Sequence, residues 1–197
     1  MARTGPSGYD KTMAEAARVP SLTPEEYLEL EWSADERHEY EGGRLWAMSG
    51  ATVRHNEIVQ NVAEVLRPAA RARGCRLYTE TVKLRTPDER FYYPDVMVVC
   101  DPSDDDPVSR ARPCFLLEVL SLSTEHRDRV VKLRAYRTLP SLEQYAIADL
   151  DRREVEVFER RGEFWTHTVL DGEAVLEVRC LGVAVGLETL FAGFEPA

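Results

Sequence analysis

The sequence lacks any long hydrophobic run. No segment approaches the roughly 18 apolar residues that a bilayer-spanning helix needs, which excludes a transmembrane helix and a membrane partner. Residues 1–20 contain no apolar stretch of about 7–15 residues such as a signal peptide carries, so we expect the protein to be cytoplasmic. There is also no internal repeat or low-complexity segment, which excludes repeat architectures.

Cysteine is scarce, with four residues in the chain. They are Cys75, Cys100, Cys114 and Cys180. None shows CxxC-type spacing, so the sequence predicts no zinc site, and nothing points to an oxidising compartment. Cys100 and Cys114 lie at or near apolar runs, where a free cysteine packs as a small hydrophobe. We therefore expect buried free thiols.

Positive charge is also in short supply. Lys and Arg number 25 against 35 Asp and Glu, which gives a net charge of −10. This balance argues against avid nonspecific binding to nucleic acid, because that affinity comes mainly from Lys and Arg at phosphates. It does not exclude a nuclease, since local basic patches count for more than the total and a bound metal ion reverses the local charge.

The remaining composition is that of an ordinary globular protein. A chain of 197 residues with 44% hydrophobic content suits one domain with a substantial core. Residues 1–20 mix Gly, Pro, Ala and charged residues without a sustained period. We interpret them as a flexible N-terminal tail that precedes a single domain over residues 21–197.

The first half of the expected domain contains two helices and a hairpin. A capping signal at Thr23 predicts a helix that reaches about Trp32. Gly42-Gly43 predicts the turn of a β-hairpin. A long amphipathic helix follows over residues 55–72, and Pro68 is expected to bend or shorten it near its end.

Strand patterns dominate the rest of the chain, with one crossover helix among them. We expect this helix to begin at Ser123 or Thr124 and to reach about Leu139, and residues 101–107 to form a polar loop. A short helical turn is expected near residues 187–191. The expected strands are 76–85, 92–100, 114–121, 142–149, 153–160, 164–170 and 175–185. This order predicts an α/β fold: a mixed central sheet flanked by helices, with an N-terminal helix and hairpin.

Two carboxylates fall in strands that should be buried. Strand alternation places Asp95 in an apolar row with Met97. Glu118 shares a face with Leu116 and Leu120. A buried, unpaired carboxylate costs several kcal/mol, so each acid needs a partner. A shared Mg²⁺ ion, with Mn²⁺ as a substitute, would satisfy both and could activate a water molecule.

A lysine follows the second acid in the chain. Positions 128, 132 and 136 form one stripe of the expected crossover helix, next to its packed stripe, so Lys132 can reach the sheet. Its amine could orient the attacking water or neutralise the charge of a transition state. The alternative is a purely structural ion network, in which Glu118 pairs with Lys132 or Arg134.

These residues resemble the PD-(D/E)XK nuclease signature and, more narrowly, the Uma-two-type family of restriction-endonuclease-like proteins of bacteria. The similarity covers about residues 36–191. The segments that carry it are Glu39–Leu45 with Met48, His55 with Ile58 and Asn61, Tyr93–Val96, Glu118–Thr124, Asp128 with Lys132 and Tyr136, and Tyr145–Asp149. The resemblance implies a restriction endonuclease-like core and metal-dependent hydrolysis of phosphodiester bonds. It also implies that Asp95 and Glu118 are catalytic metal ligands.

The sequence departs from the general signature at Leu120, where that signature has its lysine. The Uma-like relatives recruit the lysine from the next helix, which corresponds to Lys132. Three residues are candidate auxiliaries: His55 at a phosphate or water, Glu57 as an acid from the first core helix, and Glu80 if its strand neighbours that of Asp95. For His55 and Glu57 the alternatives are a capping or packing role and a solvent-exposed position.

Other residues that can carry chemistry show no such pattern. We interpret the remaining histidines as surface or packing residues, and the tryptophans as core or interface anchors, not base-stacking platforms. They are His38, His126, His167, Trp32, Trp46 and Trp165.

The sequence therefore predicts a Mg²⁺-dependent endonuclease that acts on nucleic acid, with DNA as the expected substrate. Two other functions stay open. A catalytically inactive nucleic-acid-binding or regulatory module would account for the acidic charge and Leu120, and a protein-interaction role is the other. A C₂ homodimer is compatible with either activity. Asp95→Asn and Glu118→Gln are expected to abolish Mg²⁺ binding and to leave the fold intact or slightly more stable.

Overall fold

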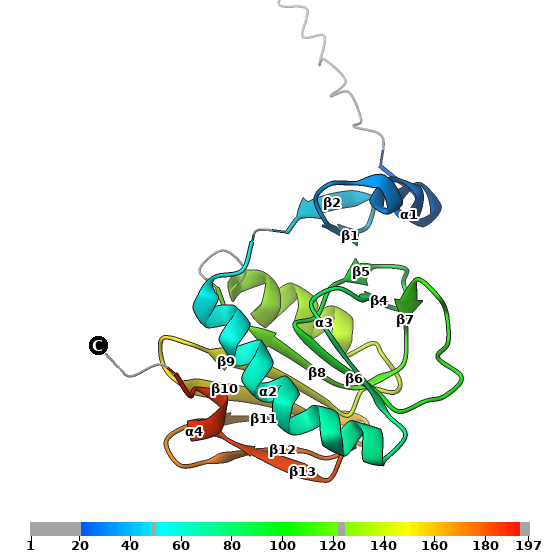
Figure 1. The fold of residues 1–197 in the computed structure, drawn as a ribbon. Helices are drawn as coiled ribbons and strands as arrows, with labels where there is room; N and C mark the ends of the chain where they lie inside the picture. The colour runs from blue at the N-terminus through cyan, green and yellow to red at the C-terminus, as the bar shows by residue number, and fades with distance from the viewer. Residues whose placement is uncertain (1–20, 49, 122–124, 194–197) are drawn as a thin grey trace, which may run out of the picture.

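The computed structural model describes residues 21–48, 50–121 and 125–193 (Figure 1). The expected tail over residues 1–20 and the expected helix start at Ser123 or Thr124 lie outside these ranges. Among the described residues, no helix is long and apolar enough to cross a membrane.

Helices and strands alternate along the described chain. The helices are α1 (Pro24–Ser33), α2 (Val53–Ala72), the π-helix η1 (Arg127–Lys132), α3 (Leu133–Tyr136) and α4 (Leu187–Leu190). The strands up to the crossover are β1 (His38–Glu41), β2 (Arg44–Ala47), β3 (Arg76–Thr79), β4 (Lys83–Arg85), β5 (Phe91–Tyr92), β6 (Val96–Val99), β7 (Ser109–Arg110) and β8 (Pro113–Val119). Those after it are β9 (Gln144–Asp149), β10 (Glu154–Arg161), β11 (Phe164–Leu170), β12 (Val175–Val178) and β13 (Val183–Gly186).

The centre of the molecule is a mixed six-stranded sheet. Its strand order is β11-β10-β9-β8-β6-β3, and only the β8–β9 pair is parallel. Helix α2 crosses one face together with α4 and the β12–β13 hairpin, and α3 lies on the other side (Figure 1). A second sheet, β2-β1-β5-β4-β7, carries the N-terminal hairpin. The expected mixed sheet flanked by helices is confirmed.

Local signals account well for the first elements. Thr23 caps α1, accepting a hydrogen bond from the Glu26 backbone while the Glu26 carboxylate accepts one from Thr23. The β1–β2 turn needs glycine, because Gly43 has a φ of +86° and an added Cβ would lie 2.4 Å from the Cβ of Ser21. Helix α2 continues through Pro68 to Ala72, so the proline does not shorten it as expected.

Three expected strands are each divided in two. The strand expected over residues 76–85 breaks at Glu80, whose φ is +51°, so that β3 stays in the central sheet and β4 joins the second one. The strand expected over 92–100 likewise becomes β5 and β6, in different sheets. The segment 175–185 is a hairpin, because Gly182 with φ +59° turns the chain back. These predictions were wrong because alternation does not reveal which sheet a strand joins.

Further differences concern the crossover region and the loop before β8. The crossover helix is π-helical over η1, and its regular part ends at Tyr136, before the expected Leu139. The polar loop expected over 101–107 leads into a short strand, β7, that the sequence did not predict.

Two predictions about packing were also wrong. The structure pairs Cys75 with Cys100 and Cys114 with Cys180 in disulfides, so the cysteines are not free thiols. Trp32 is 85% exposed and is not a core residue. The elements that bring the four sulfur atoms together are far apart in sequence, and linear spacing gave no sign of this.

Candidate active site

The expected site residues lie where β6 begins and β8 ends. In the antiparallel β6–β8 pair, Val96 is opposite Leu117. Continuing this register by one residue sets Asp95 opposite Glu118. Residues directly opposite in a sheet project from the same face. Both acids therefore belong to the face covered by α3, as the alternation of each strand predicted.

Asp95 is fixed by two hydrogen bonds from different elements. Its Oδ2 accepts a hydrogen bond from the Val119 backbone N–H at 2.7 Å, and its Oδ1 lies 3.0 Å from the Nε2 atom of His55. His55 stands in the first turn of α2, where Thr52 caps the helix by accepting from the His55 backbone. The carboxylate thus joins α2 to the central sheet.

Glu118 is 2% exposed and holds a lysine and a tyrosine on one oxygen atom. The Nζ atom of Lys132 lies 3.1 Å from Glu118 Oε1, and the Tyr136 hydroxyl donates to the same atom at 2.7 Å. The structure thus brings Glu118 and Lys132 into contact. Arg134, the other pairing partner considered for Glu118, is not among the groups that hold its carboxylate in the described contacts.

Lys132 has two further acidic partners that the sequence did not single out as site residues. Its Nζ atom lies 3.0 Å from Glu39 Oε1 and 3.1 Å from Asp128 Oδ1. Arg127 holds the other Glu39 oxygen at 2.9 Å. Asp128 was visible as part of a helical stripe. Glu39 gave no signal, because a short hairpin strand next to an exposed turn does not predict a buried carboxylate.

The charges around Lys132 are unbalanced toward the negative. Burial lowers the pKa of Lys132, but Glu118, Glu39, Asp128 and Asp95 outweigh this and hold the pKa well above its usual range. Burial raises the pKa of Glu118 well above its usual range; Lys132 opposes this, and the neighbouring acids add to it. The lysine is therefore a fixed cation among more acid than it can neutralise.

A second cluster adjoins this one and has the ligand types of a metal site. One ligand atom from each of His55, Glu80 and Asp95 lies within 4.8 Å of the others. Glu80 joins the cluster because its backbone N–H donates to the carbonyls of Pro94 and Asp95, so the strand neighbourhood on which its candidacy depended is present. Its left-handed backbone, unusual for glutamate, turns it out of β3 at this point.

The donor set fits a divalent cation. Two carboxylates and an imidazole suit Mn²⁺ and similar ions, whereas Mg²⁺ prefers oxygen ligands alone. Burial lowers the pKa of His55, but the hydrogen bond and charge of Asp95, helped by Glu80 and Asp128, raise it overall. The imidazolium thus stands where a cation is favoured. Glu118 is not a member of this group, although the charge of Asp95 acts on it.

The other candidates lie outside the two clusters. Glu57 is exposed on α2 and does not belong to the metal-ligand group of the described residues. His38 pairs with Glu31, and His167 pairs with Glu156.

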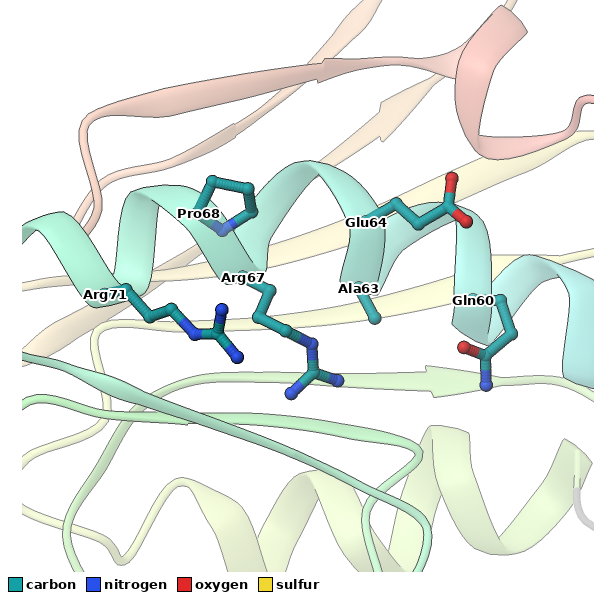
Figure 2. A pocket seen from close by; sticks show the side chains of 6 residues that line it. All are labelled: Gln60, Ala63, Glu64, Arg67, Pro68 and Arg71. Carbon is teal, nitrogen blue, oxygen red and sulfur yellow. The ribbon is translucent and has the colours of Figure 1, made fainter.

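The hollow beside α2 contains none of the expected site residues. It has a volume of about 370 Å³, and its polar lining comes from Gln60, Glu64, Arg67 and Arg71 (Figure 2). Arg67 donates to the Leu77 carbonyl at its back. The candidate active site is therefore assigned from its charges, not from the largest hollow.

The fold and the acid–lysine cluster define a restriction-endonuclease-like protein. The family model described as "Uma2: Putative restriction endonuclease" matches residues 24–189. The chain belongs to this family.

Relatives and a solved structure extend the comparison. Two uncharacterized proteins of Synechocystis sp. are similar along most of their length: slr1290 is 29% identical over 181 residues (90% of this chain, 95% of the relative), and sll1609 is 31% identical over 166 residues (82% and 94%). The crystal structure of "a putative nuclease belonging to DUF820" from Anabaena variabilis superposes with a TM-score of 0.68 at 18% identity. It covers 87% of this chain and 98% of that one, and it shows that the fold is shared.

Proposed function

We propose that this protein is a divalent-metal-dependent endonuclease that hydrolyses phosphodiester bonds of nucleic acid in the cytoplasm, with DNA as the first substrate to test. The observation that carries the proposal is the buried acid–lysine cluster at the β6–β8 register. Lys132 lies 3.1 Å from Glu118, and Asp95 is fixed on the same sheet face. Membership in a family described as restriction endonucleases supports the same activity.

Each group has a role that its surroundings allow. Asp95 and Glu118 would hold the metal ion, with His55 and Glu80 as auxiliary ligands beside Asp95. A bound ion would lower the pKa of a coordinated water molecule and stabilise charge on the phosphoryl oxygens. Lys132, kept protonated by three acidic partners, would donate a hydrogen bond to the attacking water or to the pentacovalent transition state. Tyr136 would hold Glu118 in its rotamer.

The imidazole in the donor set sharpens the expectation for the metal. Activity is expected with Mg²⁺, and Mn²⁺ is expected to bind more tightly, because it accepts nitrogen ligands more readily.

An inactive nucleic-acid-binding module is the second candidate. One observation favours it: the Oε1 atom of Glu118 already accepts from Tyr136 and contacts Lys132, and Glu118 lies outside the metal-ligand group. Leu120 occupies the position of the usual lysine.

Cleavage assays with matched variants test the proposal. Plasmid DNA, linear duplex, single-stranded DNA and RNA would be incubated with the protein in Mg²⁺, in Mn²⁺ and in EDTA. Asp95→Asn, Glu118→Gln and Lys132→Met are each expected to reduce the cleavage rate about 100-fold or more. Glu57→Gln removes an exposed carboxylate from the same helix that carries His55, and it should cleave like the wild type.

Calorimetric titration with Mn²⁺ separates the two candidates. Asp95→Asn is expected to weaken Mn²⁺ binding strongly, whereas Glu57→Gln is not. Wild-type protein that binds Mn²⁺ and nucleic acid but cleaves none of the four substrates would support the inactive module instead. Equal cleavage by all variants would rule out the assigned residues.

A further inference from the structure

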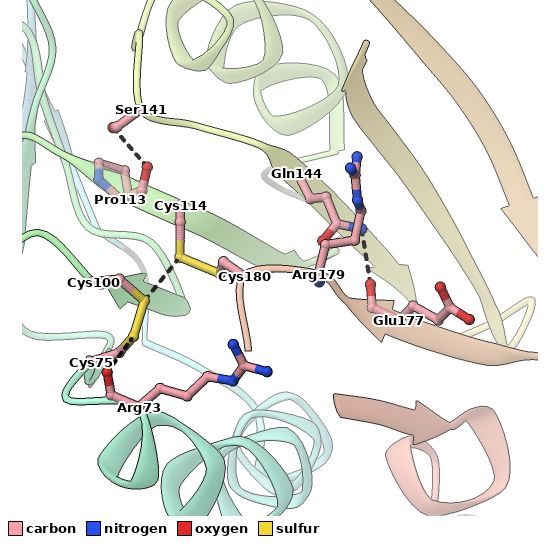
Figure 3. Close-up of a disulfide and its surroundings, with 10 residues drawn as sticks. All are labelled: Arg73, Cys75, Cys100, Pro113, Cys114, Ser141, Gln144, Glu177, Arg179 and Cys180. Carbon is pink, nitrogen blue, oxygen red and sulfur yellow. Dashed lines mark hydrogen bonds between the residues drawn. A yellow bond between two sulfur atoms is a disulfide. The ribbon is translucent and has the colours of Figure 1, made fainter. Parts of the chain in front are cut away.

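All four cysteines of the chain meet at one place, away from the acid–lysine cluster. Cys75 follows α2 and Cys100 follows β6, while Cys114 lies at the start of β8 and Cys180 in the turn between β12 and β13 (Figure 3). Because β6 and β8 are antiparallel, this end of the pair is opposite to the end that carries Asp95 and Glu118. Five residues of strand separate Asp95 from Cys100, roughly 17 Å.

The sulfur atoms are close across the two disulfides as well as within them. The Sγ atoms of Cys100 and Cys114 lie 3.7 Å apart, although these residues belong to different pairs. The sulfur atoms of Cys100, Cys114 and Cys180 all lie within 4.8 Å of one another. Four thiolates at about 2.3 Å from a tetrahedral Zn²⁺ ion stand about 3.8 Å apart. The separation between the two pairs is thus that of a zinc–sulfur tetrahedron.

The surroundings also suit a thiolate-bound ion. Cys75 and Cys114 are each 7% exposed, while Cys100 and Cys180 are half-buried, so the cluster is enclosed but reachable from solvent. The metal-ligand group at this place contains sulfur alone, and thiolate ligands select soft or borderline ions such as Zn²⁺ over Mg²⁺. The Arg73 guanidinium lies against Gly182 in the turn that carries Cys180, so a positive group adjoins what would be a dianionic site.

We propose that the four cysteines form a structural Zn²⁺ site when they are reduced, and that the two disulfides are the oxidised state of the same cluster. This site is distinct from the proposed catalytic metal site in position and in ligand chemistry. In the cytoplasmic location proposed above, thiols are kept reduced, so the zinc-bound state is the one expected in the cell.

The two states interconvert by a balanced reaction. Each disulfide takes two electrons and two protons from a dithiol reductant, which becomes a disulfide itself. The four thiols then lose four protons when they bind Zn²⁺, and the ion is held as a tetrathiolate. Reoxidation returns the electrons to an oxidised dithiol and releases the ion. Zinc affinity is therefore expected to fall with pH, because protons compete for the thiolates.

The site would replace one cross-link with another. Both states tie the end of α2 to β6, β8 and the β12–β13 turn, so the helix that carries His55 and the strands that follow Asp95 and contain Glu118 stay fixed relative to one another. A reduced protein without zinc has neither link. It is expected to be the least stable of the three forms, because an ion that binds only the folded state stabilises that state.

Metal binding by the full chain tests this proposal. Wild-type protein, reduced with a phosphine under anaerobic conditions and stripped of metal, would be titrated with Zn²⁺ and examined by native mass spectrometry. One ion per chain is expected at the cysteine cluster, together with a higher unfolding temperature. Replacement by Co²⁺ should give the intense visible bands of tetrahedral thiolate coordination.

Matched samples separate the cysteine site from the catalytic one. Asp95→Asn, which impairs the proposed catalytic site, should still show the thiolate–Co²⁺ bands, whereas Cys75→Ser/Cys180→Ser should lose them. Oxidised wild-type protein should show none. If the double variant does not fold, alkylation of reduced wild type decides the matter: Zn²⁺ should strongly slow iodoacetamide labelling of all four thiols. Reduced protein that shows no thiolate bands and no protection from labelling would overturn the proposal.

Discussion

At the scale of single residues, Lys132 determines what kind of site this is. Its ammonium contacts Glu39, Glu118 and Asp128, all buried, while the lysine itself is 5% exposed. Buried ion clusters add little net stability when complete, but removing one partner leaves uncompensated charge. The lysine is therefore needed both for the fold at this place and for the proposed reaction.

Lys132→Met is expected to destabilise the protein by about 3–5 kcal/mol at pH 7.5, because it leaves three buried carboxylates without their shared cation. Urea unfolding followed by circular dichroism measures this loss. Combining it with Glu118→Gln should recover part of the loss, since one of the orphaned charges is removed. Lys83→Met removes a half-buried lysine that stands over the Tyr93 ring, and serves as the control with a small effect. A Lys132→Met variant as stable as wild type would show that the cluster is already neutral.

At the scale of elements, breaks in the strands shape the site as much as the strands do. Glu80 interrupts the segment after β3 and enters the group with His55 and Asp95. Asp106 plays a comparable part in the loop before β8. Its carboxylate accepts from the backbone N–H groups of Val108 and Ser109 at 2.9 and 2.7 Å, and so holds the entry into β7.

Asp106→Ala is expected to lower stability by about 0.5–1 kcal/mol at neutral pH, through loss of these hydrogen bonds. The hydrogen bonds from Val108 and Ser109 lower the pKa of Asp106 from its ordinary value of 3.8. Its contribution is therefore present above pH 3.8 and is lost as the pH falls through the folded-state pKa. Urea unfolding of both proteins between pH 7 and pH 2.5 should show the difference shrinking below pH 4. Asp105→Ala, at the exposed neighbouring position, is the control; a difference independent of pH would contradict this account.

The same scale shows where sequence reasoning worked. The cap at Thr23, the glycine turn after β1 and the apolar stripe of α2 are local features, and each element formed as expected. The breaks at Glu80 and before Asp95 were missed, because a residue that leaves one sheet for another still alternates between apolar and polar neighbours.

At the scale of the whole molecule, the acidic charge sets how nucleic acid can approach. With a net charge of −10, the chain repels a phosphate backbone unless cations intervene. The acid clusters described above lie where the scissile phosphate would bind under the proposed function. Bound divalent ions would reverse the sign of the field there.

Binding to duplex DNA is therefore expected to require a divalent ion. In gel-shift or fluorescence titrations, Ca²⁺, which supports binding without hydrolysis in many metal-dependent nucleases, should strengthen DNA binding at least tenfold over EDTA. The dependence of affinity on salt should be shallow, because few Lys or Arg residues neutralise phosphates. Asp95→Asn should lose most of the Ca²⁺ effect, whereas Glu57→Gln should keep it. Tight binding in EDTA with a steep salt dependence would point to a basic surface instead.

The sequence by itself determined the local elements and the two acids that belong in buried strands. Burial of Asp95 and Glu118 followed from alternation, and the spacing of Asp128, Lys132 and Tyr136 placed them on one side of the crossover helix. These inferences hold because strand and helix periods fix which side chains share a face.

Only the tertiary structure decided which groups meet. Glu39 reaches Lys132 from the N-terminal hairpin, Glu80 reaches His55 through a break in a strand, and four cysteines from four elements bring their sulfur atoms together. Such contacts depend on how sheets and helices pack over long sequence separations. That packing is set by the summed burial of the whole core, which no local pattern contains.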